Sequence, residues 1–426
     1  MTDARIVHLG LGAFFRAHQA WYTQLANDLG GEQWGINALT GRRPDAAEVL
    51  SAQGCRYTLL ERGPDGDTPI DIRSIVAAGH GADPAVYQAA IADEKVALVT
   101  STITEKGYLV DPADHERIGT EAPVSAIGRL VDGLRVRMER SGAPIAVVPC
   151  DNLTANGSHT AKIVGELAER TDPALAEWIG QHVSFVSTMV DRITPATTDA
   201  DIADVQRLVG WQDRSPVITE PFSEWVLAGN FPGGRPAWEQ VGATIVDDVE
   251  PYEQRKLWLL NGAHSLLAYL GLSRGHETIA QAMGDDTCVQ AVHQVWADAA
   301  PCLPFDEAEI TAATDALTDR FTNANIQHRL AQIAGDGSQK LPVRFVSVQR
   351  ARLAGGLGIG QAFPTVVAAW LKHLATDLVN DPEVAPLQTE LAGLSDPTDR
   401  AVATLRFLDD ELAQDSELVA DIVAAG

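Results

Sequence analysis

Cysteine is scarce in this chain, and its spacing excludes several kinds of site. The 426 residues include four cysteines, and the closest two, Cys288 and Cys302, are separated widely enough that no CxxC motif occurs. A disulfide framework and a cysteine-based zinc or iron–sulfur site are therefore not expected. The HExxH, GxSxG and GxxxxGK[ST] patterns are absent as well. The sequence thus gives no support for zinc protease, α/β-hydrolase or P-loop chemistry.

Long apolar runs and positive charge are also in short supply. No stretch approaches the roughly 18 apolar residues of a transmembrane helix, and the N-terminus lacks the pattern of a signal peptide, so we expect a cytoplasmic protein. Basic residues number 32 against 58 acidic ones, which gives a net charge of −26. Such a surface repels phosphate backbones and anionic lipids. We therefore expect a small-molecule ligand, with no nucleic acid and no membrane as partner.

The pattern along the chain predicts two domains. Up to about residue 245, short apolar runs alternate with helical stretches, which indicates βαβ units and a mainly parallel sheet. Few strand signals remain beyond residue 250. We predict an α/β domain over 1–248 and an all-helical domain over 249–426. Expected strands cover 5–10, 34–40, 56–60, 69–75, 96–104 and 144–149, and expected helices cover 16–29, 83–93, 124–140, 158–170, 252–270, 277–300, 307–320, 325–334, 341–354, 364–376, 385–392 and 397–413.

A glycine turn follows the first expected strand. Gly10 and Gly12 stand where a dinucleotide pyrophosphate meets a strand-to-helix turn, although Phe15 replaces the third glycine of GxGxxG and a plain turn is the alternative. After the second strand, Asp45 is placed to accept ribose hydroxyls, which favours NAD. The neighbouring pair Arg42 and Arg43 would instead suit the 2′-phosphate of NADP, so NADP is not excluded.

The apolar helix expected over 252–270 carries three polar residues. Lys256, Asn261 and His264 fall within a sector of roughly 140° at about 100° per residue. Burial lowers the pKa of a lysine toward the range of a general base, and amide donors suit a developing oxyanion. Such a set fits the oxidation of an alcohol. The structural alternative is that the lysine reaches solvent, the amide bonds to the backbone and the imidazole is a satisfied core residue.

A series of short segments carries a more specific signal. They are HLGLGAFFRAHQA (8–20), TSTITEKGY (100–108), CDNLTANG (150–157), MVDRITP (189–195), EPFSEWV (220–226), KLWLLNGAH (256–264) and DGSQKLPVR (336–344). In this order they resemble the long-chain mannitol dehydrogenase family of polyol and sugar-acid oxidoreductases, over nearly the whole chain. The resemblance implies a Rossmann-type domain followed by a helical domain, and metal-independent NAD(P)-linked oxidation of a secondary alcohol to a ketone.

The resemblance also implies roles for individual residues. Lys256 would be the general acid/base, Asn152 and Asn261 the oxyanion site, His264 the group that orients the substrate oxygen, and Asp191 a ligand of a substrate hydroxyl. The coenzyme would be bound by the glycine turn and the residues around it, which are Gly10, Gly12, Phe14, Phe15 and Arg16, with Glu105 nearby.

The substrate remains open at this stage. A neutral hexitol such as mannitol needs only hydroxyl partners, whereas a sugar acid such as mannonate needs a cation, which Lys340 and Arg344 supply. We rank the mannitol/fructose and mannonate/fructuronate pairs almost equally. A non-catalytic dinucleotide sensor is the alternative function, and the Lys256, Asn261 and His264 set argues against it.

Overall fold

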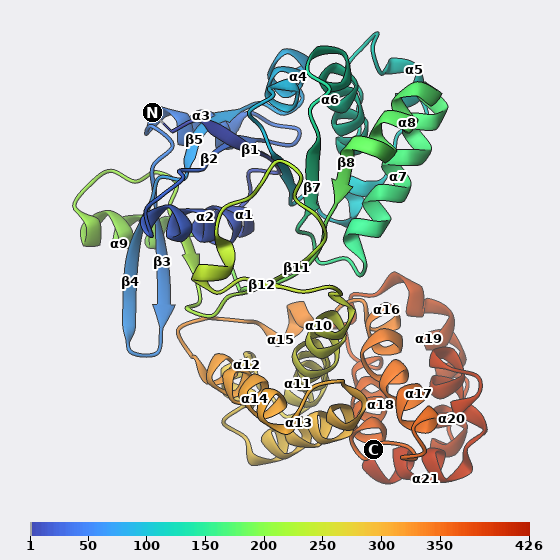
Figure 1. The fold of residues 1–426 in the computed structure, drawn as a ribbon. Coiled ribbons are helices and arrows are strands. Elements are labelled where there is room, and N and C mark those ends of the chain that lie inside the picture. The colour runs from blue at the N-terminus through green and yellow to red at the C-terminus, as the bar shows by residue number, and fades with distance from the viewer. Residues whose placement is uncertain (1) are drawn as a thin grey trace. The chain divides into compact units, whose positions relative to one another are not determined.

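The computed structural model describes residues 2–426, which form two compact units. The first ends at Glu250 and the second begins at Pro251, close to the boundary expected at residue 248. The first unit is α/β and the second is helical (Figure 1). The fold class expected from the sequence is therefore confirmed. No helix among the described residues is both long enough and apolar enough to span a membrane.

A six-stranded sheet forms the centre of the first unit. All its pairings are parallel. When β5 is counted as the third strand, the order is the 3-2-1-4-5-6 of a Rossmann domain. Ligands bind such sheets at the carboxyl ends of the strands, where the strand order reverses, which here is between β1 and β6. The order is β5 (Ile75–Gly79), β2 (Gly35–Leu39), β1 (Ala4–Leu9), β6 (Leu98–Ser101), β7 (Ile145–Pro149) and β8 (Val183–Phe185).

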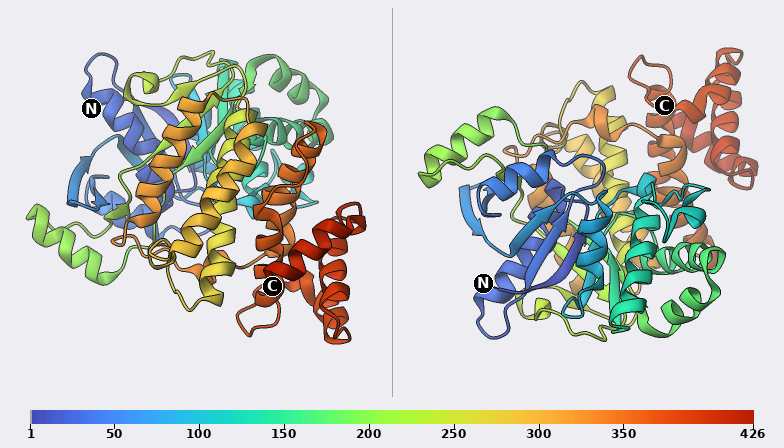
Figure 2. Two further views of the ribbon diagram at one scale, coloured as in Figure 1. Left: turned by 90° about the horizontal axis from the view of Figure 1, so that it is seen from below. Right: turned by 90° about the horizontal axis from the view of Figure 1, so that it is seen from above.

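Helices cover both faces of this sheet, as the views of the first unit in Figure 2 show. Neighbouring residues of β1 point to opposite faces: Ile6 packs in the core that contains Phe15, and Val7 packs in the core that contains Leu134. The helices of this unit are α1 (Ala13–Ala17), α2 (Gln19–Asp28), α3 (Asp45–Ala52), α4 (Pro84–Ala92), α5 (Asp114–Arg117), α6 (Ala126–Arg140), α7 (Asn156–Thr171), α8 (Pro173–His182) and α9 (Asp199–Val209).

Two small sheets complete the first unit. One contains the hairpin β3 (Tyr57–Gly63) and β4 (Gly66–Ile72) together with β10 (Val217–Thr219). The other contains β9 (Ser187–Asp191), β11 (Glu224–Ala228) and β12 (Thr244–Ile245). The strand expected over 69–75 thus splits, because its last residue opens β5, which joins the main sheet instead of the hairpin.

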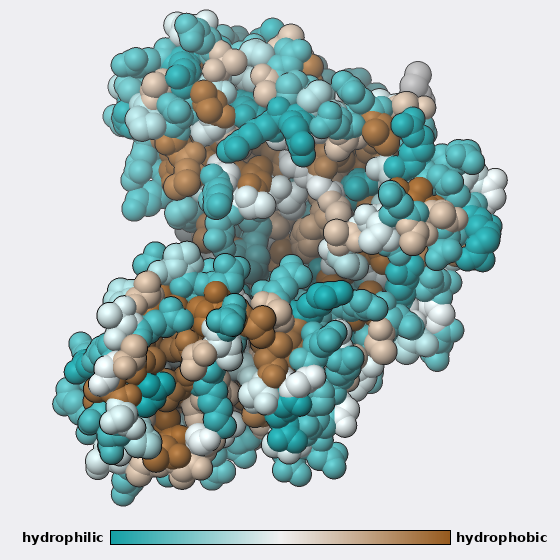
Figure 3. All heavy atoms as spheres, turned by 180° about the vertical axis from the view of Figure 1, so that it is seen from behind, coloured by the Kyte–Doolittle hydropathy of each residue, from teal (hydrophilic) through white to brown (hydrophobic). Residues whose placement is uncertain are grey.

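The second unit is built around α11 and α18, whose apolar residues share one continuous core. The C-terminal helix α21 packs Leu418, Val419 and Ile422 into that core. Its helices are α10 (Glu250–Arg255), α11 (Gly262–Ser273), α12 (Ile279–Ala282), α13 (Asp286–Ala299), α14 (Glu307–Thr322), α15 (Leu330–Ile333), α16 (Gly337–Leu341), α17 (Ser347–Ala354), α18 (Ala362–His373), α19 (Ala385–Ala392), α20 (Pro397–Leu408) and α21 (Ser416–Ala425). The face of the molecule drawn in Figure 3 carries hydrophilic residues with hydrophobic ones interspersed among them.

Several expected helices are interrupted. The helix over 16–29 is two helices that meet at His18, whose backbone (φ −120°, ψ −85°) is not helical. The helix over 277–300 breaks before Asp285, which caps α13. Of the helix over 325–334, only α15 is helical. The helices over 252–270 and 341–354 each contain a wider, π-helical turn, at η3 (Lys256–Asn261) and η5 (Pro342–Val346). Periodicity at 100° per residue does not reveal such turns.

Candidate active site

The two glycines of the first turn differ in whether a side chain would fit at their position. Gly10 has φ +109°, and a Cβ there would lie 2.1 Å from the Thr102 carbonyl oxygen. Only glycine fits that position. Gly12 is exposed, and a Cβ there would have its nearest neighbour at 3.8 Å. Packing does not demand a glycine at position 12, so its missing side chain leaves one side of the turn open, as close approach of a phosphate requires.

The aromatic residues after the turn take different positions. Phe15 is fully buried and stacks on the ring of His8, with 3.5 Å between the ring centroids. Phe14 is half-buried and stacks on His18 at 5.1 Å. Arg16 donates to the carbonyl oxygen of Ser215 at 2.7 Å. The structure therefore places Phe14 beside the open turn, and Phe15 behind it. Their coenzyme roles stay predictions.

A buried carboxylate shapes the loop after β6. Asp151 Oδ1 accepts the Thr104 amide at 2.7 Å, and Oδ2 accepts the Tyr108 hydroxyl at 2.8 Å and the Ile103 amide at 3.2 Å. Thr104 is held at φ +64°. Burial raises the pKa of Asp151, against the effect of these donors. These hydrogen bonds of Asp151 form a clamp. The clamp holds the segment before exposed Glu105 against the residue that precedes Asn152.

A second polar anchor joins β7 to β9. Asn156 is fully buried, and its amide donates to the carbonyl oxygens of Thr188 at 2.8 Å and Asp151 at 3.1 Å. The Thr188 hydroxyl in turn donates to the Pro149 carbonyl at 2.7 Å. β9 ends at Asp191, which is buried. The anchors thus fix the chain just before exposed Asn152 and the end of β9, where Asp191 lies.

The charges after β2 remain on the surface. Asp45 opens α3 and is exposed, with Arg43 Nε 3.7 Å from its carboxylate. Arg42 is exposed too. Both signs of charge are therefore available at this end of the sheet.

In the second unit, η3 changes the direction in which the polar residues of the expected helix project. The Gly262 amide donates to the Leu257 carbonyl, five residues back. A π-turn of this kind advances about 85° per residue instead of the about 100° of an α-helix. Over five residues, ideal π-helical geometry would put Lys256 and Asn261 about 65° apart around the axis, where α-helical geometry gives about 140°. Three α-helical steps further, His264 returns close to the direction of Lys256.

His264 is buried and keeps an unused nitrogen. Its Nε2 has no hydrogen-bond partner among residues 2–426, and its ring lies against Phe321 at 4.7 Å and His328 at 4.8 Å between centroids. Burial lowers its pKa well below the usual value, and the nearby His328, Arg320 and Arg344 lower it further. The imidazole is therefore neutral at physiological pH.

Two cations follow in the segment that contains η5. Arg344 Nη1 donates to the Asn261 carbonyl at 3.0 Å and to the Ser265 hydroxyl at 2.8 Å, and its buried Nε has no partner among residues 2–426. Lys340 Nζ donates to the carbonyls of Ile333 at 3.1 Å and Gly335 at 2.5 Å. Arg344 therefore contacts the π-turn directly, whereas the bonds of Lys340 tie down its own loop.

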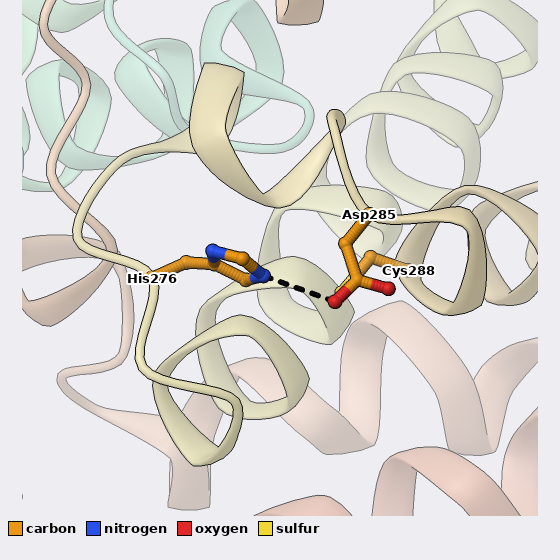
Figure 4. A group of neighbouring side chains, drawn as sticks. All are labelled: His276, Asp285 and Cys288. Atoms are coloured by element: carbon orange, nitrogen blue, oxygen red, sulfur yellow. Dashed lines mark hydrogen bonds and ion pairs between the residues drawn. The ribbon is translucent and has the colours of Figure 1, made fainter.

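Among the described residues, one group of potential metal ligands lies close together: His276, Asp285 and Cys288 (Figure 4). Both carboxylate oxygens of Asp285 already have hydrogen-bond partners. Arg274 donates to both Asp285 oxygens, at 2.6 and 3.1 Å, and His276 lies 3.1 Å from the same group. Burial raises the pKa of Cys288 to about 11, so the thiol is protonated. Asp285 therefore caps α13 and is paired with the Arg274 cation, and we assign this cluster no metal.

The comparisons with known proteins extend over both units. The profile of the mannitol dehydrogenase Rossmann domain matches residues 4–240, and that of the mannitol dehydrogenase C-terminal domain matches residues 248–425. The chain belongs to the mannitol dehydrogenase family. The resemblance inferred from its motifs is thereby confirmed.

Three similar proteins match nearly the whole chain. The chain is 38% identical to the D-mannonate oxidoreductase of Escherichia coli K12, over 99% of this chain and 92% of the relative. The structure of Pseudomonas fluorescens mannitol 2-dehydrogenase in ternary complex with NAD and D-mannitol matches with a TM-score of 0.80 at 32% identity, covering 100% of this chain and 91% of that one. A substrate-free D-sorbitol dehydrogenase matches with a TM-score of 0.90 at 28% identity, covering 99% and 92%.

The two glycines give a test of the turn. Gly10→Ala forces a side chain against the Thr102 carbonyl at a positive φ, so we expect a loss of about 2 kcal/mol or more in unfolding free energy. Gly12→Ala is the matched control and should change stability by less than about 0.5 kcal/mol. Urea unfolding followed by circular dichroism measures both. Equal stabilities of the two variants would contradict the packing argument.

Proposed function

We propose that the protein is a metal-independent, NAD-dependent oxidoreductase that interconverts the secondary alcohol of a polyol or an aldonate with the corresponding ketose or ketouronate. Its membership of the mannitol dehydrogenase family supports an oxidoreductase acting on a CH–OH group. The observation that carries the proposal is the π-helical turn η3 (Lys256–Asn261), whose ideal geometry supports grouping Lys256, Asn261 and His264 on one side of the helix.

In the proposed mechanism, the Lys256 amine takes the proton of the substrate hydroxyl as the carbon gives up its hydride. The amides of Asn152 and Asn261 donate to the oxygen as negative charge develops on it. The unused Nε2 of His264 holds the same oxygen, and because burial lowers the pKa of the ring well below its usual value, the ring does not compete for the proton. Asp191 binds a second substrate hydroxyl. In the reverse direction, Lys256 returns the proton to the ketone oxygen.

The first unit fits a dinucleotide. Exposed Gly12 leaves the space that a pyrophosphate needs, and the related mannitol 2-dehydrogenase was solved with NAD. When bound, NAD supplies the hydride acceptor. We assign Gly10, Gly12, Phe14 and Arg16 to its binding, with Phe15 supporting the turn from behind. Asp45 and Glu105 are exposed near strand ends and complete the assignment, and NAD is preferred over NADP on the strength of Asp45.

Between the two substrate classes, the surroundings of Arg344 favour a sugar acid. Its guanidinium makes no ion pair with a carboxylate within residues 2–426, and burial lowers its pKa to about 10. A half-buried cation without a counterion is costly, and the carboxylate of an aldonate would supply one. Lys340, part of the same segment, adds positive charge. The relative named D-mannonate oxidoreductase is in keeping with this choice.

The base assignment predicts a specific loss. Lys256→Ala should lower kcat by at least about a thousandfold, since general base catalysis and substrate positioning are lost together, and should leave the dissociation constant of NAD within about twofold. Initial rates and fluorescence titration measure the two quantities. Lys372→Ala, at an exposed lysine of the same unit, is the control and should be fully active. An active Lys256→Ala enzyme would refute the assignment.

The substrate assignment predicts a dependence on charge. Mannonate and mannitol differ at one end by a carboxylate, so comparing kcat/KM for the two isolates the effect of charge. We expect mannonate to be preferred, and Arg344→Met to reduce kcat/KM for mannonate at least about tenfold more than for mannitol. Arg329→Met, at an exposed arginine, is the control. An equal effect on both substrates would mean that Arg344 serves only to support the π-turn.

A further inference from the structure

One buried titratable group close to the glycine turn has no part in the proposed mechanism. His8 lies in β1, two residues before Gly10, and is completely buried. Burial lowers the pKa of its imidazole to about 3, so the ring is neutral at any pH at which the protein works. The ring lies beneath the turn and makes polar contacts through both nitrogens, which indicates that it holds neighbouring groups in place.

The contacts of His8 determine which nitrogen carries the proton. Nε2 lies 3.1 Å from the Gly10 carbonyl oxygen and 3.0 Å from the Thr102 hydroxyl. Nδ1 lies 2.8 Å from the Thr100 hydroxyl. Because a carbonyl oxygen can only accept, the neutral ring donates from Nε2 and accepts from Thr100 at Nδ1. Both of its polar atoms are therefore used, and in one orientation only.

The carbonyl that His8 binds, that of Gly10, is held by several hydrogen bonds. It also accepts the Thr102 hydroxyl at 3.0 Å and the Gly12 amide at 2.6 Å. Three donors thus set the orientation of the peptide between Gly10 and Leu11. On its flat side, the His8 ring stacks on Phe15, with 3.5 Å between centroids and 8° between planes. One side chain therefore restrains both the start of the turn and the first helical residues after it.

We propose that His8 is a positioning residue for the coenzyme: its ring holds the Gly10 peptide and Phe15 so that the turn has its binding shape before the dinucleotide arrives. A turn that is ordered in advance loses less conformational freedom on binding, and so binds more tightly. The inference rests on the proposed NAD-dependent function. It assigns His8 no contact with the coenzyme and no proton transfer.

The test separates coenzyme binding from catalysis and from folding. His8→Phe keeps a flat ring against Phe15 but removes both polar atoms, and Thr102→Val removes one donor to the Gly10 carbonyl with little change of shape. We expect His8→Phe to raise the dissociation constant and the KM of NAD about tenfold, and Thr102→Val about threefold. At saturating NAD, kcat should stay within about twofold of wild type. Thr100→Val is the control, because it leaves the bonds to the Gly10 carbonyl intact, and should have a smaller effect than either.

Binding is measured by fluorescence titration with NAD alone, and folding by thermal unfolding without ligand. A His8→Phe protein that unfolds at a lower temperature but binds NAD like wild type would overturn the proposal, because the role would then be structural only. If His8→Phe does not fold, Thr102→Val decides, and unchanged NAD affinity in that variant would overturn it. A wild-type protein that does not bind NAD at all would instead refute the proposed function, and the inference with it.

Discussion

The π-helical turn at residues 256–261 is the constraint on which the account of the catalytic side chains depends. In a regular α-helix, Lys256 and Asn261 would lie about 140° apart around the axis, at the two edges of the sector that holds the polar set. The wider turn, with the Gly262 amide bonded five residues back to Leu257, reduces that angle in ideal geometry and is proposed to bring both residues onto one side together with His264. Arg344 lies against it through the Asn261 carbonyl, from a second π-helical turn. Turns of this type are uncommon and often occur at functional sites.

The first unit positions its residues by a different principle. Its parallel strands bring their carboxyl ends to one edge, and buried polar side chains then fix the loops that leave that edge. Asp151 holds the segment after β6, Asn156 joins β7 to β9, and His8 holds the glycine turn. Each is buried and bonded on several sides, so each loop has one preferred course. Asn152 directly follows Asp151, and Gly10 lies two residues after His8.

Much of this could be predicted from the sequence, and the reasons for the rest are physical. Alternation of apolar runs predicted the parallel sheet, and the loss of strand signals predicted a helical second unit, because periodicity reports burial directly. The motifs predicted the family. The break at His18 and the two π-turns were not predicted, since each depends on hydrogen bonds rather than hydrophobic spacing. The same holds for the clamp by Asp151, whose partners Ile103 and Thr104 come from a distant part of the sequence. A histidine within the apolar run of β1 was the available signal for His8, but only the structure shows its partners.

The shared direction of Lys256 and Asn261 is tested most directly by metal bridging between engineered cysteines. In the double variant Lys256→Cys/Asn261→Cys, two thiols on one side of the helix should chelate Cd²⁺, measured by the absorbance of the cadmium–thiolate bond. Each single variant, Lys256→Cys and Asn261→Cys, serves as the control for the native cysteines. The account predicts binding by the double variant at least about a hundredfold tighter than by either single variant. Equal, weak binding by all three would mean that the helix is regular through this segment, and that the side chains of residues 256 and 261 diverge.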